Sequence, residues 1–484
     1  MMRTTIARAA LLVGLFWAAS ACGLGESLTD INENPNAPTD VTANFLLPQA
    51  IRAGVEQGMH GALFQSHTGI WPQHLVELQY PDEEQGEVRA SRMDGYFQNF
   101  YTGSLKDIQT VIDKGIETAT PNHEAVGMIW KSWIFHQVTD LWGDVPYSAA
   151  LRGEEEGGSI PVYDTQQSIY TDLLATLTSA ASLLDPSGDG FEAGDLIYDN
   201  DFAAWERFAN SLRMRLAMRL SEVDPATAQA QFVAAYNAGF RSNADNATLV
   251  WPGSPYENPL YENWLGRDDH GVSETMVDTL LSFADPRLPL YAEPAETDGV
   301  YRGHQNGRDD LPPGMSLGDF SRMGNFWREN GAATPTLIMT YSEVLFLQAE
   351  AAERGWITGT PASLYAAAIT ANMNQYDGMG APVDISAAEI ATYLAQPAVV
   401  YAGINSIYLQ KWISLYMCGS EAWFDWRRMD VPVLLAGPHY TFSRLPVRFP
   451  YPSSEQSLNF ANWDAAIARN GGLYITDPVW WDVR

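Results

Sequence analysis

The feature that most constrains the fold is the spacing of apolar residues, which recur three and four positions apart along most of the chain after Phe45. This spacing gathers apolar side chains on one face of an α-helix, whereas a half-buried strand alternates them at every second position. Alternation of the second kind is scarce. The pattern therefore predicts a mainly α-helical protein with few short strands. The longest stripe comprises Phe97, Tyr101, Leu105, Ile108, Ile112 and Ile116.

Other segments carry the same spacing. Stripes over 129–138 and 205–220 predict two more helices, the first ending before the turn Gly143–Pro146. Segments 343–356 and 364–376, joined by a glycine-rich turn, are similar to a tetratricopeptide helix pair, although no clean repeat runs through the chain. Because no long linker follows residue 40, we expect residues 41–484 to form one large domain.

The first 21 residues have the layout of a bacterial secretion signal. Arg3 and Arg8 precede an apolar run too short to span a bilayer, and small residues lead up to Cys22. A cysteine in this place is typical of a lipoprotein, in which its thiol and its new amino terminus carry acyl chains. We therefore predict a signal peptide over 1–21, lipidation at Cys22 and an extended leader over 22–40. An ordinary secretion signal is the alternative.

The composition excludes some partners and one source of stability. With 28 Lys and Arg against 59 Asp and Glu, the net charge is −31, which repels nucleic acids and anionic lipid headgroups. We expect no nucleic-acid partner, and membrane contact only through the lipid. Since Cys22 and Cys418 are the only cysteines, a lipidated Cys22 leaves no internal disulfide. Stability must then come from the core.

The run 410–432, QKWISLYMCGSEAWFDWRRMDVP, mixes aromatic rings with charges. Charges stay buried only when they are paired, so we interpret it as aromatics packed around a carboxylate–guanidinium network. Glu421 and Asp425, one helical turn apart, could imitate a glycosidase acid pair. Such acids face each other across a cleft, however, and pairing with Arg427 or Arg428 explains them better.

This run resembles the C-terminal "W…G.EAW.DWRR…P" block of the SusD/RagB family of outer-membrane nutrient-binding lipoproteins, in particular its SusD-like subgroup. DINENPNAP, near the start, resembles the N-terminal signature of that family. Four further blocks follow in the family's order: DLWGDVPYSAAL (140–151), DLIYDNDFAAWERFANSLRMRLAMRL (195–220, with Asn200 in place of the usual Gly), TPTLIMTYSEVLFLQAEAAERGW (334–356), and RLPVRFPYPSSEQSLN with PVWWD (444–459 and 478–482). Together they cover nearly the whole body.

The resemblance implies a lipid-anchored protein on the outer face of the outer membrane, seated on a SusC-like TonB-dependent β-barrel transporter. Members of the family bind a nutrient, most often an oligosaccharide, and deliver it for import without breaking bonds. We therefore expect no enzymatic activity, no cofactor and no metal. Three alternatives stay open: the same role with a peptide or other non-sugar cargo, a helical glycoside hydrolase or lyase, and a surface lipoprotein without a ligand.

Patterns that suggest catalysis or metal binding are weak. Gly314–Gly318 matches a nucleophile elbow, but Leu311-Pro312-Pro313 cannot form the central strand that this motif requires. His123-Glu124 lacks the second histidine of a zinc-binding helix. The acidic loop 185–201 could attract calcium, but its spacing does not fit an EF-hand, so a solvated loop is favoured.

Two loop regions offer what a sugar ligand needs, which is aromatic rings for its C–H face and planar polar groups for its hydroxyls. They are 71–89 and 251–269, and in the second we expect Pro and Gly to prevent regular structure. The family's ligand-binding aromatics come from these regions by analogy, although the resemblance matches no individual ring. Packing against the body is the alternative for half or more of them. The candidate ligand-binding residues are Trp71, Tyr80, Trp251, Tyr256, Tyr261, Trp264, Arg267, Asp268 and Tyr301.

Overall fold

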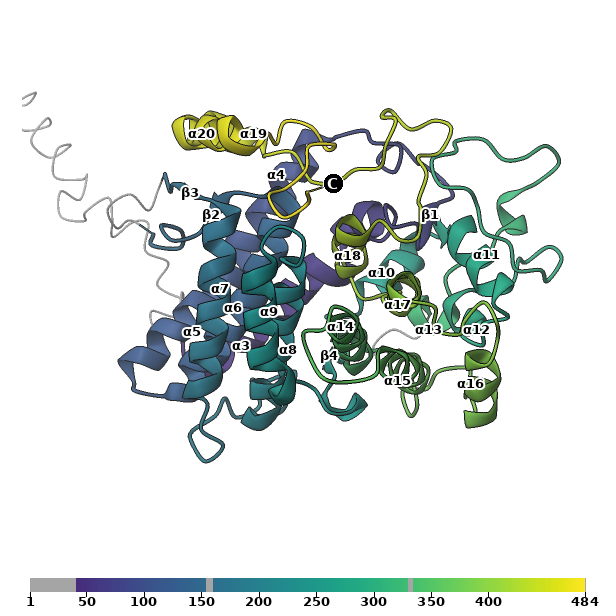
Figure 1. Cartoon of the computed structure of the whole chain (residues 1–484). Coiled ribbons are helices and arrows are strands. Elements are labelled where there is room, and N and C mark those ends of the chain that lie inside the picture. The colour runs from purple at the N-terminus through teal and green to yellow at the C-terminus, as the bar shows by residue number, and fades with distance from the viewer. Residues whose placement is uncertain (1–40, 154–159, 330–333, 484) are drawn as a thin grey trace, which may run out of the picture. The chain divides into compact units, whose positions relative to one another are not determined.

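The computed structural model describes residues 41–153, 160–329 and 334–483. The predicted signal peptide, the predicted lipidation site Cys22 and the whole of the leader lie outside these residues. Residues from Ala43 onward form one compact unit, which is mainly α-helical as predicted (Figure 1). Among the described helices, none combines the length and the apolar character needed to cross a membrane.

In the first half of this unit, the successive helices from Lys106 to Ala235 each pack against the next (Figure 1). The predicted stripe over 97–116 lies on one continuous helical path, whose middle part is the π-helical segment η3 (Phe100–Leu105). The helix over 121–142 ends before Gly143, whose φ of 85° stops it where the sequence indicated. The helices of this half are α3 (Ala43–Val55), η1 (Glu56–His60), η2 (Phe64–Thr68), α4 (Ala90–Asn99), η3 (Phe100–Leu105), α5 (Lys106–Glu117), α6 (Pro121–Trp142), α7 (Gln166–Leu183), α8 (Phe202–Arg219), α9 (Pro225–Ala235), η4 (Tyr236–Ala238) and η5 (Asn243–Asp245).

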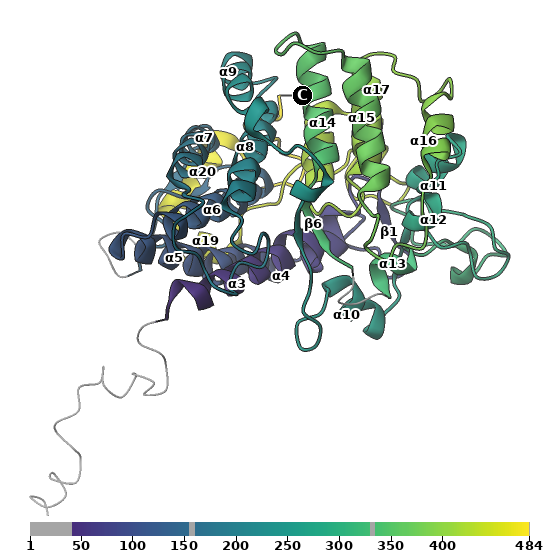
Figure 2. The same cartoon turned by 90° about the horizontal axis from the view of Figure 1, so that it is seen from below.

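The second half contains the predicted helix pair. α14 (Tyr341–Glu353) lies alongside α15 (Pro361–Asn374), and α17 (Ile404–Ser414) packs against α14 (Figure 2). Small side chains such as Ala349 and Ala368 are buried where α14 and α15 meet, which permits their close approach. The other helices are α10 (Pro259–Gly266), α11 (Glu274–Ser282), α12 (Leu288–Tyr291), η6 (Leu317–Asp319), α13 (Asn325–Arg328), α16 (Ala387–Leu394), α18 (Glu421–Met429), α19 (Ser453–Leu458) and α20 (Phe460–Asn470).

Within the described residues, the strands form three short antiparallel pairs. They are β1 (Leu75–Glu77) with β5 (His270–Val272), β2 (Val145–Pro146) with β3 (Tyr163–Asp164), and β4 (Ala247–Leu249) with β6 (Thr336–Met339). The first pair joins the first candidate loop region to the segment that directly follows the second, and so brings the two regions together. Its register places Glu77 opposite His270.

The charged network expected around α18 is present and buried. Arg428 contacts Glu350 at 2.6 Å and Asp425 at 3.2 Å, so Asp425 pairs as predicted. Glu421 instead pairs with Arg219, at 2.6 Å. The prediction failed for Glu421 because α8, distant in sequence, brings its own guanidinium into the core. Charges that are each met by an opposite charge can stay in an apolar interior.

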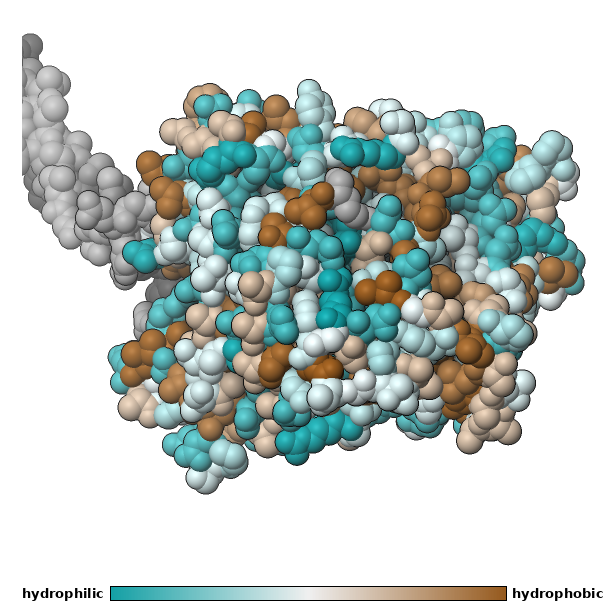
Figure 3. Space-filling view, viewed as in Figure 1, coloured by the Kyte–Doolittle hydropathy of each residue, from teal (hydrophilic) through white to brown (hydrophobic). Residues whose placement is uncertain are grey.

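The surface is mixed in character. On the face seen in Figure 3, apolar patches are small and separated by hydrophilic residues. No broad apolar face is visible in this view.

Candidate functional site

A cavity of about 770 Å³ lies where the two predicted loop regions meet. Its volume falls in the range usual for small-ligand sites. Three of the predicted residues, Tyr80, Arg267 and Asp268, line it together. The wall is completed by Ala62, Gln65, Ser66, Glu77, Gln79, Asp82, Glu83, Arg89, Arg92, Asn263, Gly266, Asp269 and His270.

Tyr80 has an unusual position in this wall. Its side chain is 65% exposed, and its φ of 60° lies in the left-handed region, which costs a residue other than glycine about 1–2 kcal/mol. The guanidinium carbon of Arg267 lies 4.7 Å from the centre of its ring. An exposed aromatic ring held in a strained backbone conformation is typical of functional sites.

The charges of the wall are compensated within the protein. Arg92 contacts Glu83 at 2.6 Å, Arg89 contacts Asp82 at 2.9 Å, and Arg267 contacts Asp269 at 2.5 Å. Asp268 accepts hydrogen bonds from Arg322 at 3.0 Å and from Arg328 at 2.8 Å. The wall thus offers planar donors and acceptors in ion pairs, an arrangement that suits hydroxyl groups better than a charged ligand.

Two titratable groups of the wall are neutral at pH 7. Burial, reinforced by Glu84 and Glu83, raises the pKa of Glu77 to about 9, so its carboxyl keeps its proton. Burial lowers the pKa of His270, so its imidazole is uncharged. Neither group adds net charge to the cavity.

The expectation that region 251–269 has no regular structure was wrong, because it contains α10. Asn258 caps this helix by accepting a hydrogen bond from the backbone N–H of Leu260 at 3.0 Å, and Pro259 occupies the first helical position. Asn followed by Pro is therefore a helix start here. α10 contributes Asn263 to the cavity wall.

Tyr261 and Trp264 also lie on α10, with ring centres 5.8 Å apart. Both are half-buried, and neither lines the cavity. They flank Asn263, which does, so they remain candidates at its edge.

Trp71 and Trp251 belong to the core, with exposures of 1% and 2%. Trp71 packs against Trp423, with ring centres 5.0 Å apart, and the indole N–H of Trp251 donates to Thr336 Oγ1 at 2.8 Å. Their rings are covered by protein, so we remove both from the candidate set.

The remaining two candidates lie outside the cavity wall. Tyr256 is 48% exposed, with the guanidinium carbon of Arg52 4.7 Å from its ring centre. Tyr301 is half-buried and packs against a part of the core that includes residues of α11 and α12.

Sequence reasoning missed several wall residues for two reasons. Gln65 and Arg92 lie on η2 and α4, outside both candidate regions, and no local pattern indicates that these helices reach the cavity. Glu77, Glu83 and Arg89 lie inside the first region but resemble solvated charges. The sequence did hold one signal for these wall residues, namely charged side chains placed between aromatic residues in a loop that contains proline.

The other patterns with possible chemistry have structural roles. Ser316 of the elbow-like motif donates to Asp319 at 2.9 Å and caps the short turn η6. In the acidic loop, Asp195 Oδ1 accepts from the backbone N–H of Ile197, and Asp201 caps α8. These carboxylates therefore fix the conformation of the backbone next to them by accepting hydrogen bonds from its N–H groups.

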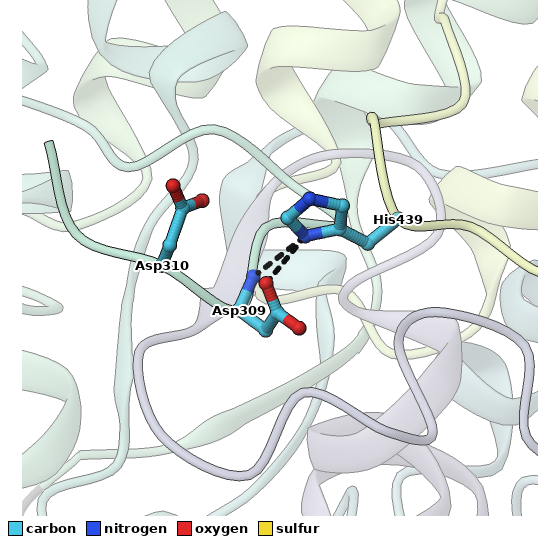
Figure 4. Close-up of side chains that lie close together, drawn as sticks. All are labelled: Asp309, Asp310 and His439. Carbon is cyan, nitrogen blue, oxygen red and sulfur yellow. Dashed lines mark hydrogen bonds and ion pairs between the residues drawn. The ribbon is translucent and has the colours of Figure 1, made fainter.

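A group made up of Asp309, Asp310 and His439 places three potential metal-ligating atoms within 4.8 Å of one another (Figure 4). All three residues are exposed. His439 Nδ1 lies 2.5 Å from Asp309 Oδ1, and Arg308 donates to both carboxylate oxygens of Asp310. Because protein partners already engage these side chains, we assign no metal to the group.

Comparison with known proteins gives a consistent result. The SusD-like family model described as "Starch-binding associating with outer membrane" matches residues 35–452. No curated protein matches the chain.

Similar solved structures cover nearly all of both chains. A structure named as a chitin-binding protein is 30% identical over 92% of this chain and 100% of its own, with a TM-score of 0.82. A chitin-binding SusD homologue from Flavobacterium johnsoniae is 25% identical over 91% and 99%, with a TM-score of 0.77. A SusD homologue from Bacteroides uniformis is 23% identical over 92% and 100%, also with a TM-score of 0.77.

Proposed function

Because this chain belongs to the SusD/RagB family, we propose that it is a surface lipoprotein that captures an oligosaccharide at the cavity around Tyr80 and delivers it to a SusC-like TonB-dependent transporter in the outer membrane. The family's association with the outer membrane and the sequence that leads up to Cys22 support the location. Lipid anchoring at Cys22 and orientation toward the cell exterior are parts of the proposal.

The observation that carries the proposal is Tyr80. An exposed ring offers a face for the C–H surface of a sugar, and the polar groups beside it can bind hydroxyls. Contact with a ligand would favour an aromatic residue at this exposed position, even though glycine would adopt its backbone conformation without strain.

The ion pairs of the wall favour an uncharged sugar over a cationic nutrient or a peptide. A charged ligand would have to compete with Arg92 for Glu83, or with Asp269 for Arg267, before its own charge was met. Chitin binding by two similar proteins, and the family's starch-binding description, make chitooligosaccharides and maltooligosaccharides the first ligands to test.

Binding without bond cleavage is part of the proposal. Two ionisable carboxyls facing each other across the ligand are what a glycosidase needs, whereas Asp82, Glu83, Asp268 and Asp269 each contact an arginine. The delivery step predicts a gene for a plugged β-barrel next to the gene for this chain.

Isothermal titration of the purified chain tests the proposal. Chitohexaose and maltohexaose are the neutral probes, and oligomers of glucosamine and of galacturonic acid are the cationic and anionic ones. We expect saturable binding of a neutral sugar, lost in Tyr80→Ala, with no new reducing ends after prolonged incubation. Binding of only charged oligomers or peptides would contradict the ligand class, and sugar cleavage would contradict the binding role.

A further inference from the structure

The segment that carries Tyr80 into the cavity begins and ends at two buried carboxyl groups. Gln79, Tyr80, Asp82 and Glu83 line the cavity, and this segment is flanked in the chain by Glu77 and Glu84. We call residues 78–83 the Tyr80 loop. Glu77 is 7% exposed and Glu84 is fully buried.

The two glutamates bind each other's backbone. The N–H of Glu77 donates to Glu84 Oε2 at 2.8 Å, and the N–H of Glu84 donates to Glu77 Oε2 at 3.4 Å. Glu84 Oε1 also accepts from the N–H of Gly307 at 2.7 Å. This reciprocal pair closes the base of the Tyr80 loop and ties it to a distant segment.

The neighbours of the pair leave its negative charge largely uncompensated. Glu77 faces Glu83, which repels a charge on it, and Arg92, which has only a minor effect. Glu84 faces the Asn306 amide and backbone N–H groups. The buried Tyr440 lies near both carboxyls, and Tyr96 lies near Glu77; burial raises the pKa of Tyr440 well above its usual value and that of Tyr96 to about 12, so both phenols stay neutral.

We propose that Glu77 and Glu84 are positioning residues whose reciprocal hydrogen bonds hold the Tyr80 loop closed while both carboxyls are uncharged, so that ligand capture at the cavity weakens as the pH rises. The inference rests on the proposed function, because it concerns the same cavity. It goes beyond that function by making the loop's closure depend on two protons.

The direction of this pH dependence follows from the burial of both carboxyl groups in the closed loop. Burial raises the pKa of Glu84 to about 7 and that of Glu77 to about 9, whereas an opened, solvated loop returns both toward 4.5. The closed form therefore holds protons that the open form releases, and closure is strongest at low pH. Closure weakens as the pH rises above about 4.5, by at most tenfold per pH unit for each proton, and this weakening ends near pH 7 for Glu84 and near pH 9 for Glu77.

The loop can be tested without any ligand. Hydrogen exchange of the amides in residues 78–86 of the full chain, corrected for the intrinsic pH dependence of exchange, should show protection that falls between pH 6 and pH 9, while amides of α6 keep theirs. In Glu77→Gln, the side-chain amide oxygen can still accept the hydrogen bond from the N–H of Glu84, and no charge can form at position 77. This variant should keep the loop protected to higher pH. Glu117→Gln, an exposed glutamate at the end of α5 and outside the cavity wall, is the matched control and should behave as the wild type.

The second measurement is the affinity for chitohexaose over the same pH range. We expect affinity to fall severalfold from pH 6.5 to 8.5 in the wild type and in Glu117→Gln, and to fall less in Glu77→Gln. His270, whose pKa is lowered, does not titrate in this window. If no oligosaccharide binds at any pH, the proposed function fails, while the exchange experiment still decides the loop. Loop protection that is independent of pH in the wild type would overturn the inference.

Discussion

Replacing Tyr80 separates binding from folding, because its ring and its backbone have different roles. In Tyr80→Gly the left-handed φ costs nothing, which recovers about 1–2 kcal/mol. Against this stand about 0.5–1 kcal/mol of added unfolded-chain entropy and about 0.5–1 kcal/mol for the exposed contact with Arg267. The free energy of unfolding should therefore change by less than about 1 kcal/mol.

The affinity should respond quite differently. Loss of a central aromatic contact weakens binding by about 1–3 kcal/mol, which corresponds to a rise in Kd of about 5- to 150-fold. Tyr80→Ala should lose the same affinity and be less stable than Tyr80→Gly, since alanine keeps the backbone strain. Tyr80→Phe keeps the ring and should retain most of the affinity.

Titration calorimetry with the neutral oligosaccharide that binds, and urea unfolding of the same four proteins, measure both quantities. The reasoning is refuted if Tyr80→Gly binds like the wild type, or if its stability falls by more than about 2 kcal/mol. The first result would remove Tyr80 from the site. The second would show that its ring packs more than its exposure indicates.

Three further substitutions test the edge of the site, the buried charge network and the lipid anchor. Trp264→Ala should weaken sugar binding by about 1–3 kcal/mol with little change in Tm, whereas a lower Tm at unchanged affinity would assign this ring to packing with Tyr261. Glu421→Ala leaves the buried Arg219 partly unpaired and should destabilise the fold by about 3–5 kcal/mol in urea unfolding; a loss below about 1 kcal/mol would contradict the buried network. Cys22→Ala should move the protein from the membrane to the soluble fraction, and its persistence in membranes would argue against the lipid anchor.

The helices were predictable where their apolar stripes are long. α6 and the pair α14 and α15 lie where the spacing placed them, because a long run of apolar residues at helical spacing is a local property of the sequence. α10 was missed because it has only eight residues and its start looks like loop chemistry. Short helices depend on a cap more than on a stripe.

The site was predictable only in part, for a physical reason. Tyr80 and Trp71 are both aromatic residues in the same proline-containing region, yet one is exposed and the other is buried against Trp423. What separates them is contact with segments far away in the chain. Local patterns carry no information about such contacts, and the roles of Gln65 and Arg92 were hidden for the same reason.

The paired charges around the cavity have a consequence for where such a protein can work. Dissolved ions screen attraction between separated charges over roughly 8–10 Å, so receptors that attract charged ligands lose affinity as salinity increases. Here Arg89, Arg92 and Arg267 are already neutralised by neighbours at contact distance, and an uncharged sugar feels no long-range field. The affinity of the protein for an uncharged sugar should therefore be nearly the same at low and at high salt concentration.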